Sequence, residues 1–389
     1  MEVIYIVSSI SYIVVNLLNG RFFILFITFI FMKNILKELV EISSVTGDVV
    51  NCKKAIDFVK DIAIKSGLKT KVLEKDGVFT LIMGKEIKKE AKIILNGHLD
   101  VVPAKKDMFK TRLEGDRMIG RGTSDMKGGD VAMLLALTEL IKEGEDPDVL
   151  LIFTTDEEVG GFKGIKLLVD DGFKADIVFI PDGGEDGKVC TDQKGVFHIL
   201  LKAKGTSAHG SRPWKGENAV LKLVTVFQRL EEEFKKRWGE CTEDDSWKPT
   251  LNLGMLKGGE FANQVPDLAE MKVDIRFPSP ITLSLLRDLV NGCLEGMSGI
   301  EMEVLSTGSP LSIDVKNSFV KSWVKLFKKK VDFIRECGAS DGRFFAERGM
   351  SVLLTKPLSS EPHMDGEWVD LKSVETFKEV LKGWIRENG

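Results

Sequence analysis

Short apolar segments that run into acidic residues or a histidine constrain this chain most. The segments 92–96, 149–154 and 177–180 are rich in isoleucine, leucine, valine and phenylalanine, and stretches with helical spacing at 33–68 and 126–142 alternate with them. This alternation is typical of a largely parallel α/β sheet that helices cover on both faces. In such a sheet, side chains just beyond the carboxyl ends of the strands meet at one edge, where ligands bind.

The pattern changes after residue 192. We expect a strand at 195–204, a helix at 218–236, strands at 250–257 and 268–277, a helix at 282–297 and a strand at 300–305. This βαββαβ order is that of a ferredoxin-like α+β unit. Residues 306–389 return to helix, strand and a long C-terminal helix. The sequence therefore predicts one α/β domain from 33–192 and 306–389, with 193–305 inserted and a hinge near residues 192 and 306.

Residues 1–32 form a separate hydrophobic segment. Residues 3–32 are long enough to span a bilayer, but Arg21 lies within them, where a charge is costly. Glu2 stands where a signal peptide carries basic residues. Three interpretations stay open: a mis-assigned start with Met32 as the first residue, a single-span membrane anchor, and a signal peptide.

The amino-acid composition indicates which binding partners and which cellular compartment to expect. The chain has 55 Lys and Arg against 59 Asp and Glu, a net charge of −4, so it lacks the basic excess of a nucleic-acid binder. Its 5 cysteines are scattered without a C-x-x-C pair, which argues against a disulfide framework or a cysteine zinc site. A reducing, cytoplasmic location is the simpler expectation, with membrane anchoring possible if residues 3–32 are genuine.

Candidate metal ligands follow the predicted strands. A His-x-Asp pair ends the first strand, and acidic residues follow the others: His98, Asp100, Glu157, Glu158 and Asp182. Asp125 sits between a glycine-rich loop and a helix start, where a helix N-cap is the alternative interpretation. Histidine and carboxylate donors without cysteine suit divalent zinc first, with cobalt or manganese as alternatives. One shared carboxylate would place two ions about 3.5–4 Å apart.

Taken together, these motifs resemble the M20 metallopeptidases, which include dipeptidases, aminoacylases, carboxypeptidase G, acetylornithine deacetylase and succinyl-diaminopimelate desuccinylase. The resemblance runs from about residue 33 to residue 389 and implies a zinc-peptidase-like catalytic domain with an inserted lid. It is carried by Gly97-His98-Leu99-Asp100, Gly122-Thr123-Ser124-Asp125-Met126-Lys127-Gly128-Gly129, Thr155-Asp156-Glu157-Glu158, Asp182, Ser207-Ala208-His209-Gly210 and His363.

The resemblance also implies residue roles. His98 and Asp182 would hold one metal ion, Glu158 and His363 the other, and Asp125 would bridge them. Asp100 would orient His98, and Glu157 would be the general base. The lid histidine, His209, would reach an active site, often that of the partner subunit, in a homodimer formed through 193–305. Asp156 has no implied role and is expected to be a surface acid, and His198 a structural or surface histidine.

The expected reaction is hydrolysis of an amide or peptide bond beside a free carboxylate, in a dipeptide or N-acyl amino acid. Asn263, Arg276 and Arg343 are candidates to bind that carboxylate, with surface ion pairs as the alternative. Asp182 stands where many relatives have glutamate, and Ala339 where desuccinylases have threonine. Succinyl-diaminopimelate desuccinylase or acetylornithine deacetylase is therefore the second choice. A catalytically silent, membrane-anchored binding domain is remote, because every implied metal and base position holds a competent residue.

Overall fold

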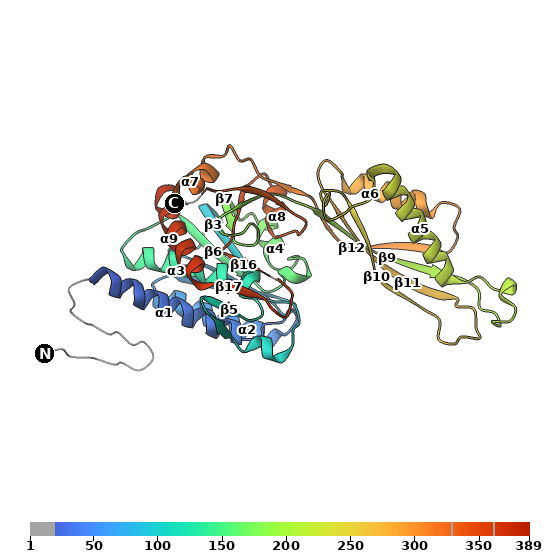
Figure 1. Cartoon of the computed structure of the whole chain (residues 1–389), viewed down its shortest axis with the longest axis horizontal. Helices are drawn as coiled ribbons and strands as arrows, with labels where there is room; N and C mark the ends of the chain where they lie inside the picture. The colour runs from blue at the N-terminus through green and yellow to red at the C-terminus, as the bar shows by residue number, and fades with distance from the viewer. Residues whose placement is uncertain (1–19, 328–329, 361) are drawn as a thin grey trace.

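The computed structural model describes residues 20–327, 330–360 and 362–389, with side chains described from residue 28 onward. The chain forms a larger α/β unit and a smaller α+β unit, joined by two extended connections (Figure 1). The larger unit contains both the N-terminal helix α1 and the C-terminal helix α9, so distant parts of the sequence pack together in it. The smaller unit comes from the middle of the chain.

The larger sheet carries the residues of interest at the ends of its central strands. It has the order β1-β2-β6-β3-β7-β15-β8-β13, and β14 pairs with β8. The central strands β6, β3, β7 and β15 are mutually parallel. Every residue of β6 is buried; because alternate side chains face opposite sides, both faces of the sheet are covered. The strands are β1 (Lys69–Lys75), β2 (Val78–Gly84), β3 (Glu90–His98), β6 (Val149–Thr154), β7 (Lys174–Ile180), β8 (Val189–Gln193), β13 (Leu311–Ser312), β14 (Phe333–Glu336) and β15 (Ser351–Leu354).

Helices pack on this sheet through apolar faces. The helix α3 contacts α1, α9 and β3, whereas α2 packs on β1 and β2, and α8 packs on β7 and β15. Side-chain caps fix the starts of α2 and α9, where Asp48 accepts from the Asn51 amide and Asp370 from the Ser373 amide. The helices are α1 (Gly20–Glu41), α2 (Val49–Lys65), α3 (Gly128–Lys142), α4 (Ile165–Asp170), α7 (Ser318–Leu326), α8 (Gly342–Glu347) and α9 (Leu371–Asn388).

The hydrophobic N-terminal segment lies only partly within the described residues, because 1–19 fall outside them. The helix α1 begins at Gly20 and continues without a break through Met32, whose side chain is fully buried. Leu36, Leu39 and Val40 of the same helix are also buried in the core. In the part of the chain that the structure describes, we find no helix with the length and apolar character needed to cross a bilayer.

The smaller unit has the βαββαβ order expected from the sequence. Its antiparallel sheet has the order β10-β11-β9-β12, and α5 and α6 lie on one face of it (Figure 1). Alternate residues of β11, including Met271, Val273 and Ile275, point into a core under these helices. The elements are β9 (Gly195–Lys204), α5 (Ala219–Trp238), β10 (Thr250–Gly258), β11 (Leu268–Phe277), α6 (Leu283–Leu294) and β12 (Ile300–Gly308).

Candidate metal centre

Three neighbouring parallel strands deliver candidate ligands to one edge of the larger sheet. His98 is the last residue of β3. Glu157 and Glu158 lie in a short 3-10 turn after β6, and Asp182 follows β7. Because β6, β3 and β7 are adjacent and parallel, their carboxyl ends converge, as the sequence indicated.

Asp125 lies between two histidines that are far apart in the sequence. Its Oδ1 atom lies 3.1 Å from Nε2 of His98, and its Oδ2 atom lies 3.1 Å from Nε2 of His363. The same Nε2 atom of His363 lies 3.1 Å from Oε2 of Glu158. Each oxygen of one carboxylate therefore faces a different histidine, which is the arrangement that a bridging ligand needs.

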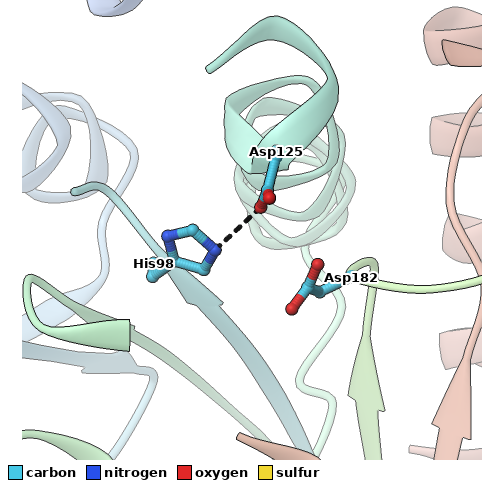
Figure 2. Close-up of side chains that lie close together, drawn as sticks. All are labelled: His98, Asp125 and Asp182. Atoms are coloured by element: carbon cyan, nitrogen blue, oxygen red, sulfur yellow. Dashed lines mark hydrogen bonds and ion pairs between the residues drawn. The ribbon is translucent and has the colours of Figure 1, made fainter. Parts of the chain in front are cut away.

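Among the residues that the structure describes, two groups of side chains could hold a metal ion, and Asp125 belongs to both. Within each group the donor atoms lie within 4.8 Å of one another. One group is His98, Asp125 and Asp182, which point toward a common centre (Figure 2), and the other is Asp125, Glu158 and His363. Imidazole and carboxylate donors without a thiolate fit zinc and similar divalent ions. The donor set therefore fits two ions that share Asp125.

The charge balance of the cluster also favours bound cations. Burial raises the pKa of Glu157 well above its usual range, and the negative charge of Asp182 adds to this effect. Burial likewise raises the pKa of Asp182, with Asp125 adding to it. Hydrogen bonds to Asp125 and Glu158 raise the pKa of His363 to about 10. The acidic side chains thus draw protons into the cluster, and a metal ion would supply the same positive charge.

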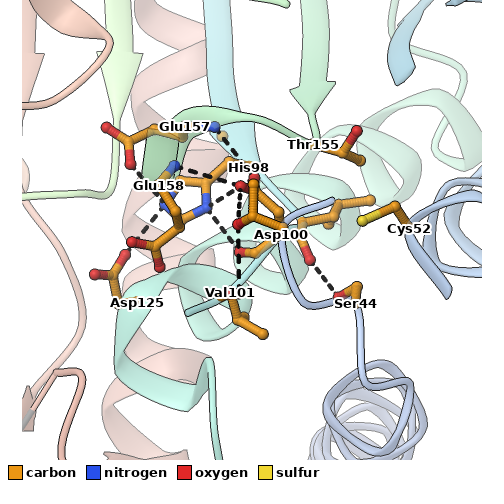
Figure 3. Close-up of polar contacts among 12 residues, drawn as sticks. Ser44, Cys52, His98, Asp100, Val101, Asp125, Thr155, Glu157 and Glu158 are labelled. Atoms are coloured by element: carbon orange, nitrogen blue, oxygen red, sulfur yellow. Dashed lines mark hydrogen bonds and ion pairs between the residues drawn. The ribbon is translucent and has the colours of Figure 1, made fainter. Parts of the chain in front are cut away.

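Asp100 is fully buried and organises the residues around His98 (Figure 3). Its carboxylate accepts the backbone amides of Glu157 and Glu158, both at 3.3 Å, and the hydroxyl of Thr46 at 2.8 Å. Nδ1 of His98 lies 3.0 Å from the backbone oxygen of Asp100 and 3.5 Å from its carboxylate. The carboxylate therefore fixes the turn that carries Glu157 and Glu158, while the main chain makes the shorter contact with His98.

Glu367 positions the loop of Asp125, a role that the sequence analysis missed. This fully buried carboxylate accepts the backbone amides of Ser124 at 2.9 Å and Asp125 at 3.1 Å, and it pairs with Arg121. Asp125 itself has non-helical backbone angles, and its carboxylate caps no helix. The N-cap alternative for Asp125 is therefore wrong. No local pattern in the sequence singles out Glu367, because its partners lie more than two hundred residues earlier in the chain.

The expectation that Asp156 is a surface acid is wrong. Its side chain is 2% exposed, and Oδ2 accepts the backbone amides of Lys163 at 2.8 Å and Gly164 at 3.1 Å. Burial raises the pKa of this carboxyl group. Asp156 therefore closes the loop after the 3-10 turn of Glu157 and Glu158, which keeps both glutamates at the strand end.

A cavity of about 540 Å³ lies over the cluster of candidate metal ligands and extends to the smaller unit. Arg276 and His198 reach it from strands β11 and β9. Both contact one carboxylate, because Nε of Arg276 and Nε2 of His198 each lie 2.9 Å from Oδ1 of Asp274. The sequence interpretation of His198 overlooked this cavity-lining position. The lining includes Asp125, Glu157, Glu158, Asp182, His363 and Arg343.

The three candidates for binding a substrate carboxylate are placed differently. Arg276 lines the cavity from the smaller unit. Arg343 also lines it. Its guanidinium donates to the backbone oxygens of Gly160 at 2.7 Å and Ser340 at 3.2 Å, so both terminal nitrogens already donate a hydrogen bond within the protein. Asn263 is exposed and is not among the described residues that line the cavity.

His209 is likewise exposed and outside the described lining of the cavity. It lies next to Asn263, since the Gly210 amide donates to the Asn263 backbone oxygen at 2.6 Å. Nδ1 of His209 accepts the backbone amide of Ser211 at 3.1 Å. In the neutral ring, Nε2 therefore carries the proton and is available as a donor. The structure thus brings His209 and Asn263 together, outside the described lining of their own chain's cavity.

Comparison with known proteins decides the family. The sequence model of peptidase family M20/M25/M40 matches residues 94–387, most of the chain. The chain belongs to peptidase family M20/M25/M40. A probable carboxypeptidase of Aspergillus terreus is 30% identical over 291 residues, covering 68% of this chain and 64% of that protein. A second probable carboxypeptidase, from Ajellomyces capsulatus, is 33% identical over 201 residues, or 48% of this chain and 45% of its own length. This M20 chain thus matches less than two thirds of these relatives' length.

Solved structures share the fold of this M20 chain. The M20 family metallo-carboxypeptidase Sso-CP2 from Sulfolobus solfataricus superposes with a TM-score of 0.76 at 19% identity, covering 91% of this chain and 99% of that one. The dipeptidase Dug1p from Saccharomyces cerevisiae gives a TM-score of 0.71 at 16% identity, covering 94% and 97%. The expected zinc-peptidase-like α/β fold is therefore confirmed.

Proposed function

We propose that this chain is a two-metal hydrolase that cleaves an amide or peptide bond beside a free carboxylate. The placement of Asp125 carries the proposal, because its two oxygens face the histidines of two separate ligand groups. The general base proposed is Glu157, whose Oε2 lies 4.0 Å from Nε2 of His98 and which lines the cavity. The ions proposed are zinc, with cobalt or manganese as alternatives.

The residues around the centre can carry a proton from the attacking water to the leaving amine. Divalent ions held by His98, Asp182, Asp125, Glu158 and His363 would supply Lewis acidity toward water and the substrate carbonyl. Glu157 takes a proton from the attacking water and later donates it to the leaving amine. Its backbone amide is fixed by Asp100, so the carboxylate starts from a defined position. Asp100 thus acts as a positioning residue.

The free carboxylate of the substrate would bind Arg276, which lines the same cavity as the candidate metal ligands and pairs with Asp274 only through Nε. A planar guanidinium suits a carboxylate because it can contact both oxygens. Two relatives are named as probable carboxypeptidases, a name for enzymes that cleave at a free C-terminus, which supports a short peptide or N-acyl amino acid as substrate. A succinyl-diaminopimelate desuccinylase is the second candidate, since a Mycobacterium tuberculosis protein named for that activity is 28% identical over 218 residues.

We also propose that residues 193–305 act as a lid and as the dimer interface. His209 is exposed and outside the described lining of its own cavity, although its Nε2 is available to donate. A second copy would place this histidine at the partner's cavity, where it could stabilise the oxyanion that forms during attack. Asn263, its neighbour, would accompany it and contact the substrate carboxylate.

The test is an assay of amine release by the zinc- or cobalt-loaded protein. The panel contains dipeptides, the same peptides with amidated C-termini, N-acetyl amino acids and N-succinyl-diaminopimelate. We expect turnover of a free-carboxylate substrate that a chelator abolishes, and at least a tenfold preference over the amidated form, because the charge-assisted contact to Arg276 is lost. Equal turnover of amidated peptides would contradict the carboxylate assignment. Turnover of the succinyl substrate alone would select the second candidate.

A further inference from the structure

Two exposed thiols from different units face the same carbonyl oxygen. Cys241 follows α5 in the smaller unit, and Cys337 follows β14 in the larger one. Sγ of Cys241 lies 3.6 Å from the backbone oxygen of Ser246, and Sγ of Cys337 lies 3.9 Å from that oxygen. The chain thus brings two accessible sulfurs together although almost a hundred residues separate them.

The loop that carries Cys241 is fixed against the larger unit by several contacts. The buried ammonium of Lys194, located between β8 and β9, donates to the backbone oxygens of Ser246 at 2.6 Å and Lys248 at 2.7 Å. The ring of Trp247 has the guanidinium of Arg335 at 5.3 Å and the ammonium of Lys194 at 5.9 Å from its centre. Because these cations attract the Trp247 ring and Lys194 binds the loop's backbone, the loop keeps Cys241 beside Cys337.

We propose that Cys241 and Cys337 form a disulfide bond when a small-molecule disulfide is present, and that this bond ties the smaller unit to the larger one. The thiolate of one cysteine attacks a sulfur of the small disulfide and releases one small thiol. The second cysteine then attacks the resulting mixed disulfide and releases the other small thiol. Two protein thiols are oxidised, one small disulfide is reduced to two thiols, and the two protons pass to the released thiols.

The other cysteines are poor partners in this exchange. Cys52, Cys190 and Cys293 are buried, and burial raises the pKa of Cys52 to about 12 and that of Cys190 further. The thiolate is the attacking species, so buried thiols that hold their protons react slowly. The exchange is therefore selective for the two exposed cysteines.

The position of the bond gives it a mechanical consequence. The two units are otherwise linked covalently where β8 continues into β9 and where β12 continues into β13. A bond between Cys241 and Cys337 adds a third link near the first connection. Cys337 also precedes Gly338 and Ala339, which line the cavity over the metal ligands. The disulfide would therefore restrict movement of the smaller unit relative to that wall of the cavity.

The test treats the full chain with glutathione disulfide, blocks the remaining thiols, digests the protein without reductant and maps the peptides by mass spectrometry. We expect a linked peptide containing both cysteines, its disappearance after reduction with dithiothreitol, and its absence from the Cys241→Ser and Cys337→Ser variants. The matched control is the double variant Cys241→Ser and Thr242→Cys, in which the thiol is moved to the next residue, which is also exposed. That variant should take up glutathione without linking efficiently to Cys337.

Two results would overturn the proposal. One is glutathione bound separately to Cys241 and Cys337 in the wild-type protein with no linked peptide. The other is equally efficient linking by the displaced thiol of the control variant, which would mean that the native placement of Cys241 has no part in the reaction. Neither metal nor substrate enters this measurement, so its outcome is independent of the hydrolase proposal.

Discussion

The Nε2 atom of His363 lies 3.1 Å from Oδ2 of Asp125, and this contact joins the C-terminal part of the chain to the loop before α3. The ring reaches that position from a backbone with φ of 64°, in the left-handed region that residues other than glycine rarely adopt. Such a conformation persists where the surroundings impose it, and functional sites are common examples. Both parts of the larger unit therefore contribute to the cluster of candidate metal ligands.

Replacing the shared carboxylate should affect both ligand groups. We expect Asp125→Asn to lower the zinc content of the purified protein at both positions, because an amide offers one weaker oxygen where two ions need an anionic bridge. Zinc per chain is measured by inductively coupled plasma mass spectrometry, with circular dichroism to confirm folding. His363→Ala is the comparison variant. It should lose zinc mainly from the group of Asp125, Glu158 and His363, because His363 belongs to that group alone. Full occupancy in a folded Asp125→Asn protein would refute the bridge.

The neighbouring residues Glu157 and Glu158 should respond in opposite ways to the same substitution. Glu157→Gln should keep the metal content and lower kcat by about 10²–10⁴-fold, the usual contribution of a general base. Glu158→Gln should lose metal, because its Oε2 faces His363 in the second ligand group. Each variant is the control for the other, since the size and charge change are identical. Metal loss in Glu157→Gln with retention in Glu158→Gln would reverse the two assignments.

Zinc binding should release protons at neutral pH. In the metal-free protein, hydrogen bonds to Asp125 and Glu158 raise the pKa of His363 to about 10, so the ring is protonated between pH 6.5 and 10. The contribution of this charged ring to the stability of the metal-free fold is present below its ordinary pKa of about 6.5 and is lost as the pH rises through about 10.

A metal ion requires the neutral ring, so the proton must leave on binding. Isothermal titration calorimetry at pH 7 in buffers with different ionisation enthalpies measures the number of protons released. We expect at least one proton per chain in the wild type and fewer in His363→Ala. A binding enthalpy that does not depend on the buffer would contradict the assignment of His363 as a ligand.

Asp156 should matter for stability more than a surface acid does. Removing its carboxylate leaves the backbone amides of Lys163 and Gly164 without their acceptor, which costs about 1–3 kcal/mol for buried groups. Urea unfolding of Asp156→Ala should therefore show a lower free energy of unfolding. Asp146→Ala, at an exposed position, is the control and should change it by less than about 0.5 kcal/mol. Equal effects of the two substitutions would argue against the role of Asp156.

The proposed dimer predicts that two inactive variants complement each other. His209→Ala lacks the lid histidine, and Glu157→Gln lacks the base. If His209 acts on the partner's cavity, a mixed dimer contains one cavity with both residues intact. After mixing and exchange of subunits, part of the activity should return, whereas each variant alone stays inactive. No recovery in a preparation that demonstrably contains mixed dimers would place His209 in its own chain's reaction or outside catalysis.

Local sequence patterns were sufficient for much of the fold. The alternating residues of β11 and the continuous apolar run of β6 determine how many faces of each strand are buried, so the two kinds of sheet could be predicted separately. The order of elements between Gly195 and Gly308 follows from the same periodicities. By contrast, the pairing of β8 with β13, β14 and β15 depends on contacts between distant segments, which no local pattern indicates.

The site was only partly predictable for a related reason. The strand-end rule placed His98, Glu157 and Asp182 together, because each follows a recognisable strand. Asp156 was misjudged because its burial depends on the amides of Lys163 and Gly164 in a later turn. Glu367 was missed because its partners lie more than two hundred residues earlier, in the loop of Asp125. Buried acids that hold loops through backbone amides carry no periodic signal.

The central claim is that Asp125 is shared by two metal ions. Anomalous diffraction from crystals of the zinc-loaded protein, recorded on both sides of the zinc absorption edge, tests it most directly. We predict two peaks flanking Asp125, about 3.5–4 Å apart, one beside His98 and Asp182 and the other beside Glu158 and His363. A single peak, or peaks that do not contact Asp125, would contradict the account.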